Sequence, residues 1–221
     1  MMGLHQAFSE LTFDPPVRGY VHTPDSPSGD GVVLTHGAGG NAHMPLLVAF
    51  AEAFASAGFV VLRCDLPFRQ QRSFGPPRPG DAARDRLGLK NAVMTLRGSG
   101  GVKRRFLGGQ SYGGRQASML LTEDQVADGL LLLSYPLHPP GKPEQLRVQH
   151  LPQIKVPAMF VHGTHDPFGS IEEIEAARKL IPARTKLVPV ESAGHDLGFK
   201  GKSKRDALPS RIVEEFRQFF G

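Results

Sequence analysis

The sequence has a single cysteine, Cys64, so it cannot form an internal disulfide bond. A lone thiol is typical of proteins in a reducing compartment, and we expect a cytoplasmic protein. The chain also lacks any apolar run as long as the ~18 residues that a membrane-spanning helix needs, so we expect no membrane partner. Its first residues, MMGLHQAFSE, have no basic start followed by an apolar stretch and do not resemble a secretory signal.

Tryptophan is absent, and aromatic residues make up only 8% of the chain, which leaves few rings for stacking on bases. The formal net charge is +5, and part of it gathers at Lys103-Arg104-Arg105 and at Lys200 to Arg205. Such clusters fit an anionic ligand, a nucleic-acid surface or simply a solvated face. Because no nucleic-acid motif accompanies them, we favour a solvated face and expect no nucleic-acid partner.

Short apolar runs alternate with longer helix-like segments along the 221 residues. The runs are apolar on both faces and end at glycine, proline or polar residues, which is typical of buried parallel strands. They are 32–35, 59–62, 105–107, 130–133, 158–161 and 186–190. The helix-like segments are 45–57, 82–96, 112–121, 171–180 and 208–220. This alternation predicts an α/β fold with a mostly parallel, doubly wound sheet and helices on both faces, in one domain spanning 1–221.

Two further features complete the predicted fold. The segment from Phe8 to Thr23 is predicted to form two antiparallel edge strands, and Ser170 to Glu173 has the pattern of a helix capping box.

In open α/β sheets, ligands bind outside the carboxyl ends of the strands. The polar residues that follow the predicted strands should therefore gather at one edge: His36, Asp65, Ser111, His138, His162, Asp166 and His195.

The segment Gly109-Gln110-Ser111-Tyr112-Gly113 is a G-x-S-x-G motif between a predicted strand and a predicted helix. In that context the serine lies in a tight, strained turn that exposes its hydroxyl at the helix amino terminus. Side chains at the flanking glycines would collide with the adjoining strand and helix. The motif predicts that Ser111 is a nucleophile, although a glycine-rich turn with an incidental serine is the simpler alternative.

A serine hydroxyl becomes a good nucleophile only when a base removes its proton. With this motif the chain order is serine, acid, histidine. Downstream of Ser111, the stretch FVHGTHDPFG offers Asp166 as the acid, and VPVESAGHDLG offers His195 as the base. Asp65 precedes the serine, and Asp196 directly adjoins the histidine, so both are weaker candidates for the acid.

A serine nucleophile also requires two donors that stabilise the oxyanion. One is expected from the amide of Tyr112, which follows the serine, and the other from the loop HGAGGN, residues 36–41. Within that loop we expect Ala38, with Gly39 as second choice, to provide the amide. A turn needed only for chain reversal is the alternative.

A metal site at His162, His165 and Asp166 is a further possibility, because imidazole and carboxylate both bind zinc. Two histidines spaced three apart in a loop are a weak signal, and the serine motif explains Asp166 better. We therefore expect no metal and no other cofactor. His138 lines a pocket or orders the surrounding proline turn, and the sequence leaves both alternatives open.

These motifs together resemble the α/β-hydrolase superfamily. The stretches LTHGAGGN, LGGQSYGGR, SYPLHPPGKPEQLR, VHGTHDPFG and AGHDLG resemble its compact dienelactone-hydrolase-like group, which includes the testis-expressed hydrolase-like proteins and a subunit of the non-specific-lethal chromatin complex. The resemblance implies a catalytic triad of Ser111, Asp166 and His195. It implies little about substrate, because some members of the group act in protein assemblies.

About twenty residues separate the strands near Tyr135 and Pro157, too few for a helical cap domain. We therefore expect a serine esterase without a cap that acts on a small acyl substrate. The loop from Pro67 to Asp81 should overhang the site, and Arg69, Phe168, Gly39 and His138 are the candidate pocket residues. A non-catalytic scaffold or binding protein with the same fold is the alternative, and the oligomeric state stays open.

Overall fold

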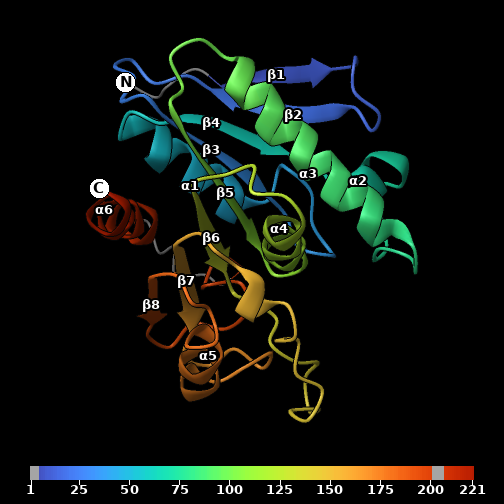
Figure 1. Cartoon of the computed structure of the whole chain (residues 1–221), viewed down its shortest axis with the longest axis vertical. Helices are drawn as coiled ribbons and strands as arrows, with labels where there is room; N and C mark the ends of the chain where they lie inside the picture. Colours follow the sequence, from blue (N-terminus) through green and yellow to red (C-terminus); the bar gives the residue numbers. More distant parts are fainter. Residues whose placement is uncertain (1–4, 201–206) are drawn as a thin grey trace.

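The computed structural model describes residues 5–200 and 207–221, and Figure 1 shows their arrangement. One sheet of eight strands has the order β1-β2-β4-β3-β5-β6-β7-β8. The strands are β1 His5–Glu10, β2 Val17–His22, β3 Asp30–Thr35, β4 Val60–Cys64, β5 Arg104–Gln110, β6 Gly129–Leu133, β7 Ala158–Gly163 and β8 Thr185–Val190. Among the described strands, β1 pairs antiparallel with β2 and β2 pairs antiparallel with β4, as the sequence predicts for the first two strands, and the other pairs are parallel.

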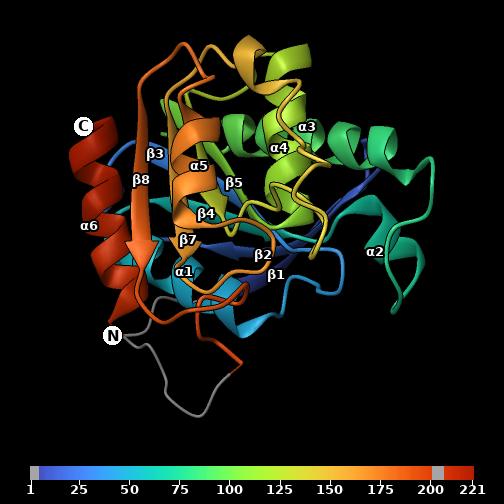
Figure 2. The same ribbon diagram turned by 90° about the horizontal axis from the view of Figure 1, so that it is seen from below.

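Helices cover both faces of this sheet. They are α1 Pro45–Ser56, α2 Pro67–Gln71, α3 Asp81–Gly98, α4 Tyr112–Glu123, α5 Ile171–Arg178 and α6 Leu208–Phe220, with a short 3₁₀ turn at Leu151–Gln153. One buried apolar cluster contains residues of α3, α4 and α5, and the other contains residues of α1 and α6. Figure 2 accordingly shows α3 and α4 on the opposite side of the sheet from α1. The doubly wound architecture expected from the sequence is present.

Local signals in the sequence explain several helix boundaries. Pro45 starts α1, Gly58 with φ 94° follows its end, and Pro209 lies in the first turn of α6. Proline is favoured in a first turn because its missing amide hydrogen would lack a helical acceptor there. At α5, the Ser170 side chain accepts from the Glu173 amide while the Glu173 carboxylate accepts from the Ser170 amide. The capping box predicted for α5 is confirmed.

The connection from β6 to β7, residues 134–157, carries only the 3₁₀ turn and no cap domain, and the structure describes all of it. The connection from β4 to α3 differs from the prediction. Residues 67–71, expected to belong to a loop, form the short helix α2, which starts at a proline. A helix of little more than one turn is too short to show a hydrophobic period, so the pattern could not reveal it.

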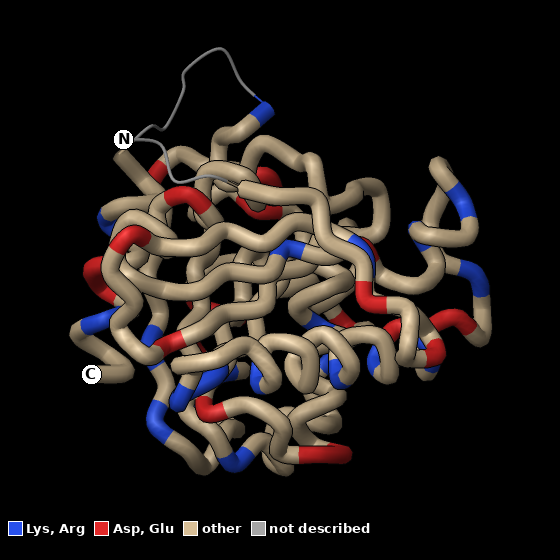
Figure 3. The backbone as a smooth tube through the Cα atoms, turned by 90° about the horizontal axis from the view of Figure 1, so that it is seen from above, with Lys and Arg blue, Asp and Glu red and all other residues tan. Residues whose placement is uncertain are grey.

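Charged residues of both signs are interspersed along the described chain (Figure 3). In the basic cluster at the start of β5, Arg104 pairs with Asp30 at 2.8 Å and Arg105 lies 3.6 Å from Asp128. These partners favour a solvated face over an anion site. Of the second cluster, Lys200 to Arg205, residues 201–205 lie outside the described residues. No described helix combines the length and apolar character needed to cross a membrane.

The parallel strands end in register at one edge of the sheet. Thr35 of β3 lies opposite Gly109 of β5, and Gln110 lies opposite Leu133 of β6. At the far side, Gly163 of β7 lies opposite Val190 of β8. The loops that leave β3, β5, β7 and β8 therefore start close together, and they carry the residues that the sequence singles out. Cys64, at the end of β4, is buried in the apolar core, as expected for a small hydrophobic side chain.

Candidate active site

Ser111 occupies a strained turn between β5 and α4, with φ 52° and ψ −117°. A positive φ is uncommon for a residue other than glycine. Its amide donates to the Leu133 carbonyl at 2.8 Å, which ties the turn to β6. A Cβ at Gly109 would lie 2.7 Å from the Gly114 nitrogen, and one at Gly113 would lie 2.4 Å from the His36 oxygen. The glycines are therefore required by the close approach of strand, turn and helix.

This close approach predicts the effect of one added methyl group. In Gly113→Ala the new Cβ meets the backbone of His36, which cannot move aside as a side chain can. We expect Gly113→Ala to destabilise the fold by about 1–3 kcal/mol and to lower its melting temperature by several degrees. Thermal unfolding followed by circular dichroism measures the shift.

The matched control is Gly98→Ala, because nothing lies within 4 Å of a Cβ at that last residue of α3 among the described atoms. Alanine favours a helical backbone over glycine by ~0.5–1 kcal/mol, so this variant should be at least as stable as the wild type. Equal melting temperatures for the two variants would contradict the steric explanation.

Three side chains from separate loops form a continuous chain of hydrogen bonds. His195, after β8, has its Nε2 2.8 Å from Ser111 Oγ. Its Nδ1 lies 2.8 Å from Oδ2 and 3.0 Å from Oδ1 of Asp166, after β7. Because a carboxylate accepts, the imidazole proton belongs on Nδ1, and the lone pair of Nε2 faces the serine hydroxyl. The arrangement can deprotonate Ser111.

The surroundings hold this chain in place. The Asp166 side chain is fully buried, and its Oδ1 also accepts from the Phe168 amide at 2.9 Å. The Phe168 ring stacks on the His195 ring with 4.1 Å between centroids. In addition, the Gln110 side chain donates from Nε2 to the His195 main-chain carbonyl at 3.1 Å. The imidazole is therefore fixed through its ring and through its backbone.

The two rival carboxylates have other partners. Asp65 accepts from the Ala42 amide at 2.7 Å, in the loop after β3. Asp196 accepts from the amides of Gly198 and Lys200 at 3.0 and 2.7 Å. The hydrogen bond from His195 therefore goes to Asp166, as the chain order predicts.

The histidines weighed for a metal site do not converge. His162 is buried, and its Nε2 lies 2.8 Å from the Gly169 carbonyl and 3.6 Å from Asp166 Oδ2, whereas His165 is exposed. Burial lowers the pKa of His162, so its imidazole is neutral beside Asp166. Among the described residues, no group of three or more His, Cys, Asp or Glu side chains is placed to hold a metal ion. His162 packs at the strand end beside the Asp166 carboxylate.

Two backbone amides near Ser111 are available as donors. Tyr112 is the first residue of α4, where an amide has no helical acceptor. Neither its amide nor that of Ala38 has a hydrogen-bond acceptor among the described residues. Gly39 is exposed, and a Cβ there would have no described atom within 4 Å, so its backbone faces open space. These features suit an oxyanion hole that a substrate can reach.

The remaining pocket candidates have partners within the protein. His138 is buried; its Nδ1 lies 2.8 Å from the Pro139 carbonyl and its Nε2 3.3 Å from Glu173, contacts that support the ordering of the proline turn. Arg69 is also buried and donates to backbone carbonyls. Phe168, by contrast, stacks its ring on that of His195.

A groove of about 940 Å³ lies elsewhere, between α1 and α6. It is lined by Asp30 and Arg104, which start β3 and β5, so it lies at the amino ends of the strands. Ser111 follows the opposite end of β5. The described residues that line the groove include no histidine or cysteine, so the hydrogen-bonded chain at the carboxyl edge, and not this groove, identifies the site.

Two residues that support the site escaped the sequence analysis. Gln110 occupies a variable position of G-x-S-x-G, and Asp85 lies inside α3, where its buried carboxylate accepts from the Tyr112 hydroxyl at 2.7 Å. An acidic residue on the same helix face as Leu89 and Ala92 is the signal that could have pointed to Asp85.

The fold and the site define a hydrolase of the α/β class, and comparison with known proteins agrees. A family model described as an alpha/beta hydrolase domain matches residues 29–220, so the chain belongs to the alpha/beta hydrolase family.

Solved structures share the fold over nearly the whole chain. A dienelactone hydrolase from Anabaena variabilis has a TM-score of 0.76 at 19% identity, covering 100% of this chain and 98% of that one. XC6422 from Xanthomonas campestris, described as an α/β serine hydrolase without a lid, has a TM-score of 0.76 at 16% identity, with coverage of 97% and 94%. Est1E from Butyrivibrio proteoclasticus has a TM-score of 0.73 at 18% identity, with coverage of 97% and 98%. The resemblance to dienelactone hydrolase is thus confirmed at the level of the fold.

Proposed function

We propose that this hydrolase cleaves small esters through a covalent acyl-enzyme on Ser111. The observation that carries the proposal is the unbroken hydrogen-bonded chain from Ser111 Oγ through His195 to Asp166, with the serine in a strained turn. Strained backbone at such a turn costs of order 1–3 kcal/mol and persists only where the surrounding structure imposes it. The spacing of the three groups suits proton transfer from the serine without rearrangement.

In the proposed reaction, His195 Nε2 takes the proton of Ser111 as Oγ attacks the ester carbonyl carbon. The imidazolium that forms is stabilised by the Asp166 carboxylate at Nδ1. The tetrahedral intermediate collapses, its bond to the leaving oxygen breaks, and His195 returns the proton to the leaving alcohol. Water then attacks the acyl carbon with His195 again as the base, which releases the carboxylic acid and restores the serine.

The negative charge on the carbonyl oxygen needs donors placed in advance. We propose the amides of Tyr112 and Ala38, which come from the two loops that meet beside Ser111. Their lack of other acceptors among the described residues supports this role. The N-terminal end of α4, where Tyr112 lies, adds a favourable dipole for an oxyanion.

The absence of a cap over residues 134–157 leads to a prediction about substrate size. Each methylene that enters an apolar pocket contributes about 0.8 kcal/mol, or roughly fourfold in catalytic efficiency. Without an enclosed channel, this gain should end after a few carbons. We expect kcat/KM for 4-nitrophenyl esters to peak at short acyl chains, from acetate to butyrate.

The experiment is a series of 4-nitrophenyl esters from acetate to dodecanoate at fixed salt. A value of kcat/KM that climbs steadily through the long chains would contradict an open site. If no ester in the series is hydrolysed faster than by the buffer, the proposed esterase activity is wrong. Arg69 and Arg72 are not expected to select an acidic acyl group, because Arg69 donates to backbone carbonyls and Arg72 pairs with Asp81 at 2.8 Å.

A further inference from the structure

Arg69 of α2 lies behind the loop that carries the candidate donor Ala38. Its side chain is buried, and four backbone carbonyls accept from its guanidinium. Nε donates to Gly40 at 2.7 Å, and Nη2 donates to Ala38 at 3.0 Å and to Gly75 at 2.9 Å. Nη1 donates to Arg72 at 3.1 Å. An arginine offers five donors in a rigid fork, and here most of them are directed at main chain rather than at solvent or an acid.

Two of these carbonyls, those of Ala38 and Gly40, belong to the loop of residues 36–41, which we call the donor loop. Because these carbonyls are held, the direction of amides in the loop is set. A peptide unit is planar, so holding a carbonyl also fixes the N–H of the following residue. The Ala38 carbonyl held by Arg69 thereby fixes the Gly39 amide. The preceding peptide unit, between Gly37 and Ala38, is held by His36, whose Nδ1 donates to the Gly37 carbonyl at 2.8 Å. This contact fixes the Ala38 amide. Both candidate oxyanion amides, Ala38 and Gly39, are thus oriented from behind.

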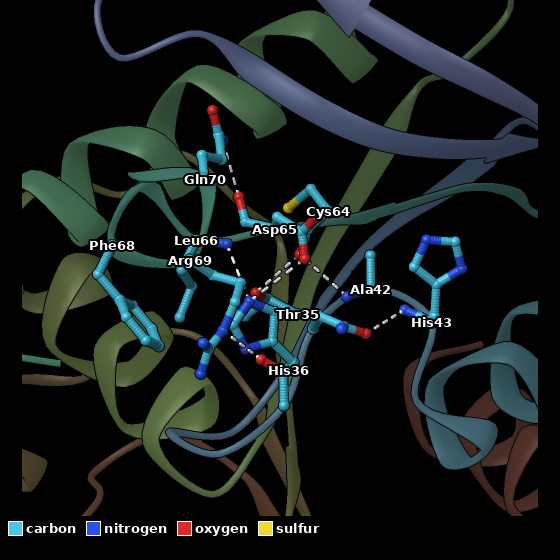
Figure 4. A network of polar contacts seen from close by, with 12 residues as sticks. Thr35, His36, Ala42, His43, Cys64, Asp65, Leu66, Phe68, Arg69 and Gln70 are labelled. Carbon is cyan, nitrogen blue, oxygen red and sulfur yellow. Dashed lines mark hydrogen bonds and ion pairs between the residues drawn. The ribbon is translucent and has the colours of Figure 1, made fainter. Parts of the chain in front are cut away.

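The protonation of His36 follows from its two contacts. The Leu66 amide is a donor and points at His36 Nε2 at 3.1 Å, so Nε2 must accept. The remaining proton is on Nδ1, which makes that nitrogen the donor to Gly37. Burial lowers the pKa of His36, which keeps it in this neutral form. Figure 4 shows His36 of the donor loop and Ala42, which directly follows that loop, together with Asp65, Leu66 and Arg69.

The same short helix is also connected to the second donor. The Phe68 amide donates to Asp85 Oδ1 at 3.0 Å, and the Tyr112 hydroxyl donates to Oδ2 of the same carboxylate at 2.7 Å. The rings of Phe68 and Tyr112 pack edge to face, with 5.8 Å between their centroids. Helix α2 therefore contacts both segments from which the oxyanion donors come.

From these contacts we propose that Arg69 is a positioning residue of the oxyanion hole, one that acts through the donor loop and not by binding substrate. The inference rests on the proposed serine mechanism. The guanidinium holds the Ala38 and Gly40 carbonyls, which fixes the direction of the Gly39 amide and, together with the contact of His36 to the Gly37 carbonyl, keeps the loop in one conformation for the developing oxyanion. Its bond to Gly75 also connects the donor loop to the segment that follows α2. Donors fixed in advance stabilise the transition state without reorganisation during the reaction.

The kinetic test compares Arg69→Met, which keeps an unbranched stem but removes every donor, with Arg69→Lys, which keeps the charge. The matched control is Arg72→Gln, because Arg72 donates to Asp81 and Pro76 and has no bond to the donor loop. With 4-nitrophenyl acetate we expect kcat to fall about 10²-fold in Arg69→Met with little change in KM. Arg69→Lys should lie between this variant and the wild type, and Arg72→Gln within a few-fold of the wild type.

An unchanged kcat with a raised KM would overturn the proposal, because it would make Arg69 a substrate-binding residue. An equal loss in Arg72→Gln would also overturn it, because the effect would then come from general loosening of the 72–80 segment.

A second measurement does not depend on activity. Hydrogen–deuterium exchange by mass spectrometry should be faster in Arg69→Met for peptides covering 37–44, where the amides of Gly40 and Ala42 are protected by hydrogen bonds. Peptides from α6 should exchange as in the wild type, which shows that the variant is folded. Unchanged exchange at 37–44 would overturn the role of Arg69. A wild-type protein that hydrolyses no ester would instead refute the proposed function, and the exchange data would still decide whether Arg69 holds the loop.

Discussion

Ser111→Ala should abolish labelling by a fluorophosphonate probe and lower kcat for 4-nitrophenyl acetate by several orders of magnitude. The probe reacts only with an activated serine, and Ser111 Oγ is the hydroxyl that lies 2.8 Å from the His195 base. Removal of the nucleophile from a well-studied triad costs about 10⁶ in kcat, and the small rate that remains there comes from the oxyanion hole and substrate binding alone. Gel fluorescence after labelling and initial rates measure the two effects.

Ser134→Ala is the matched control for this experiment. Ser134 follows the neighbouring strand β6 and also has a positive φ of 51°. Its buried hydroxyl has no hydrogen-bond partner among the described residues, so no base activates it. We expect this variant to be labelled like the wild type. If the Ser111→Ala variant is still labelled by the fluorophosphonate probe, the proposed mechanism is wrong.

Asp166→Asn should lower kcat by on the order of 10⁴, as the same change does in a serine protease triad. An amide does not stabilise the imidazolium as a carboxylate does. It also favours the tautomer whose proton is on Nε2, and that proton would then face Ser111 Oγ instead of a lone pair. Pre-steady-state kinetics should show that acylation itself is slowed, while KM changes little.

The control is the neighbouring carboxylate in the same loop as the base. Asp196 accepts from two backbone amides and has no bond to the His195 ring, so Asp196→Asn should keep kcat within several-fold of the wild type. Comparable losses in the two variants would mean that the net charge near His195, and not the contact with Asp166, determines the rate.

The sequence predicted the strands and helices well where a hydrophobic period or a flanking glycine or proline was present. Runs such as 130–133 are buried on both faces, so their composition alone indicates central parallel strands. The chain order of Ser111, Asp166 and His195 also predicted which side chains meet, because parallel strands end at one edge. These inferences depend on local pattern and on topology, which a sequence carries directly.

The sequence could not indicate which partner a buried polar side chain chooses. Arg69 was expected at the substrate because its loop overhangs the site, yet its guanidinium faces the carbonyls of residues 38 and 40. The partners of Gln110 and Asp85 were equally hidden from the sequence. Gln110 bonds to His195, 85 residues away, and Asp85 bonds to Tyr112, 27 residues away. Such pairings depend on three-dimensional packing, which periodicity does not encode.

The positions of β5, β7 and β8 in the sheet have a consequence for biosynthesis. Ser111 follows a strand with neighbours on both sides, whereas His195 follows β8, the last strand of the sheet in both space and sequence. A nascent chain therefore carries its serine long before it has the base that activates it. On the proposed mechanism, the hydroxyl stays unreactive while the polypeptide emerges and becomes reactive only when the final edge strand docks. The proposed mechanism would likewise couple turnover to the integrity of that edge, so partial opening at β8 would stop catalysis while the rest of the sheet is still intact.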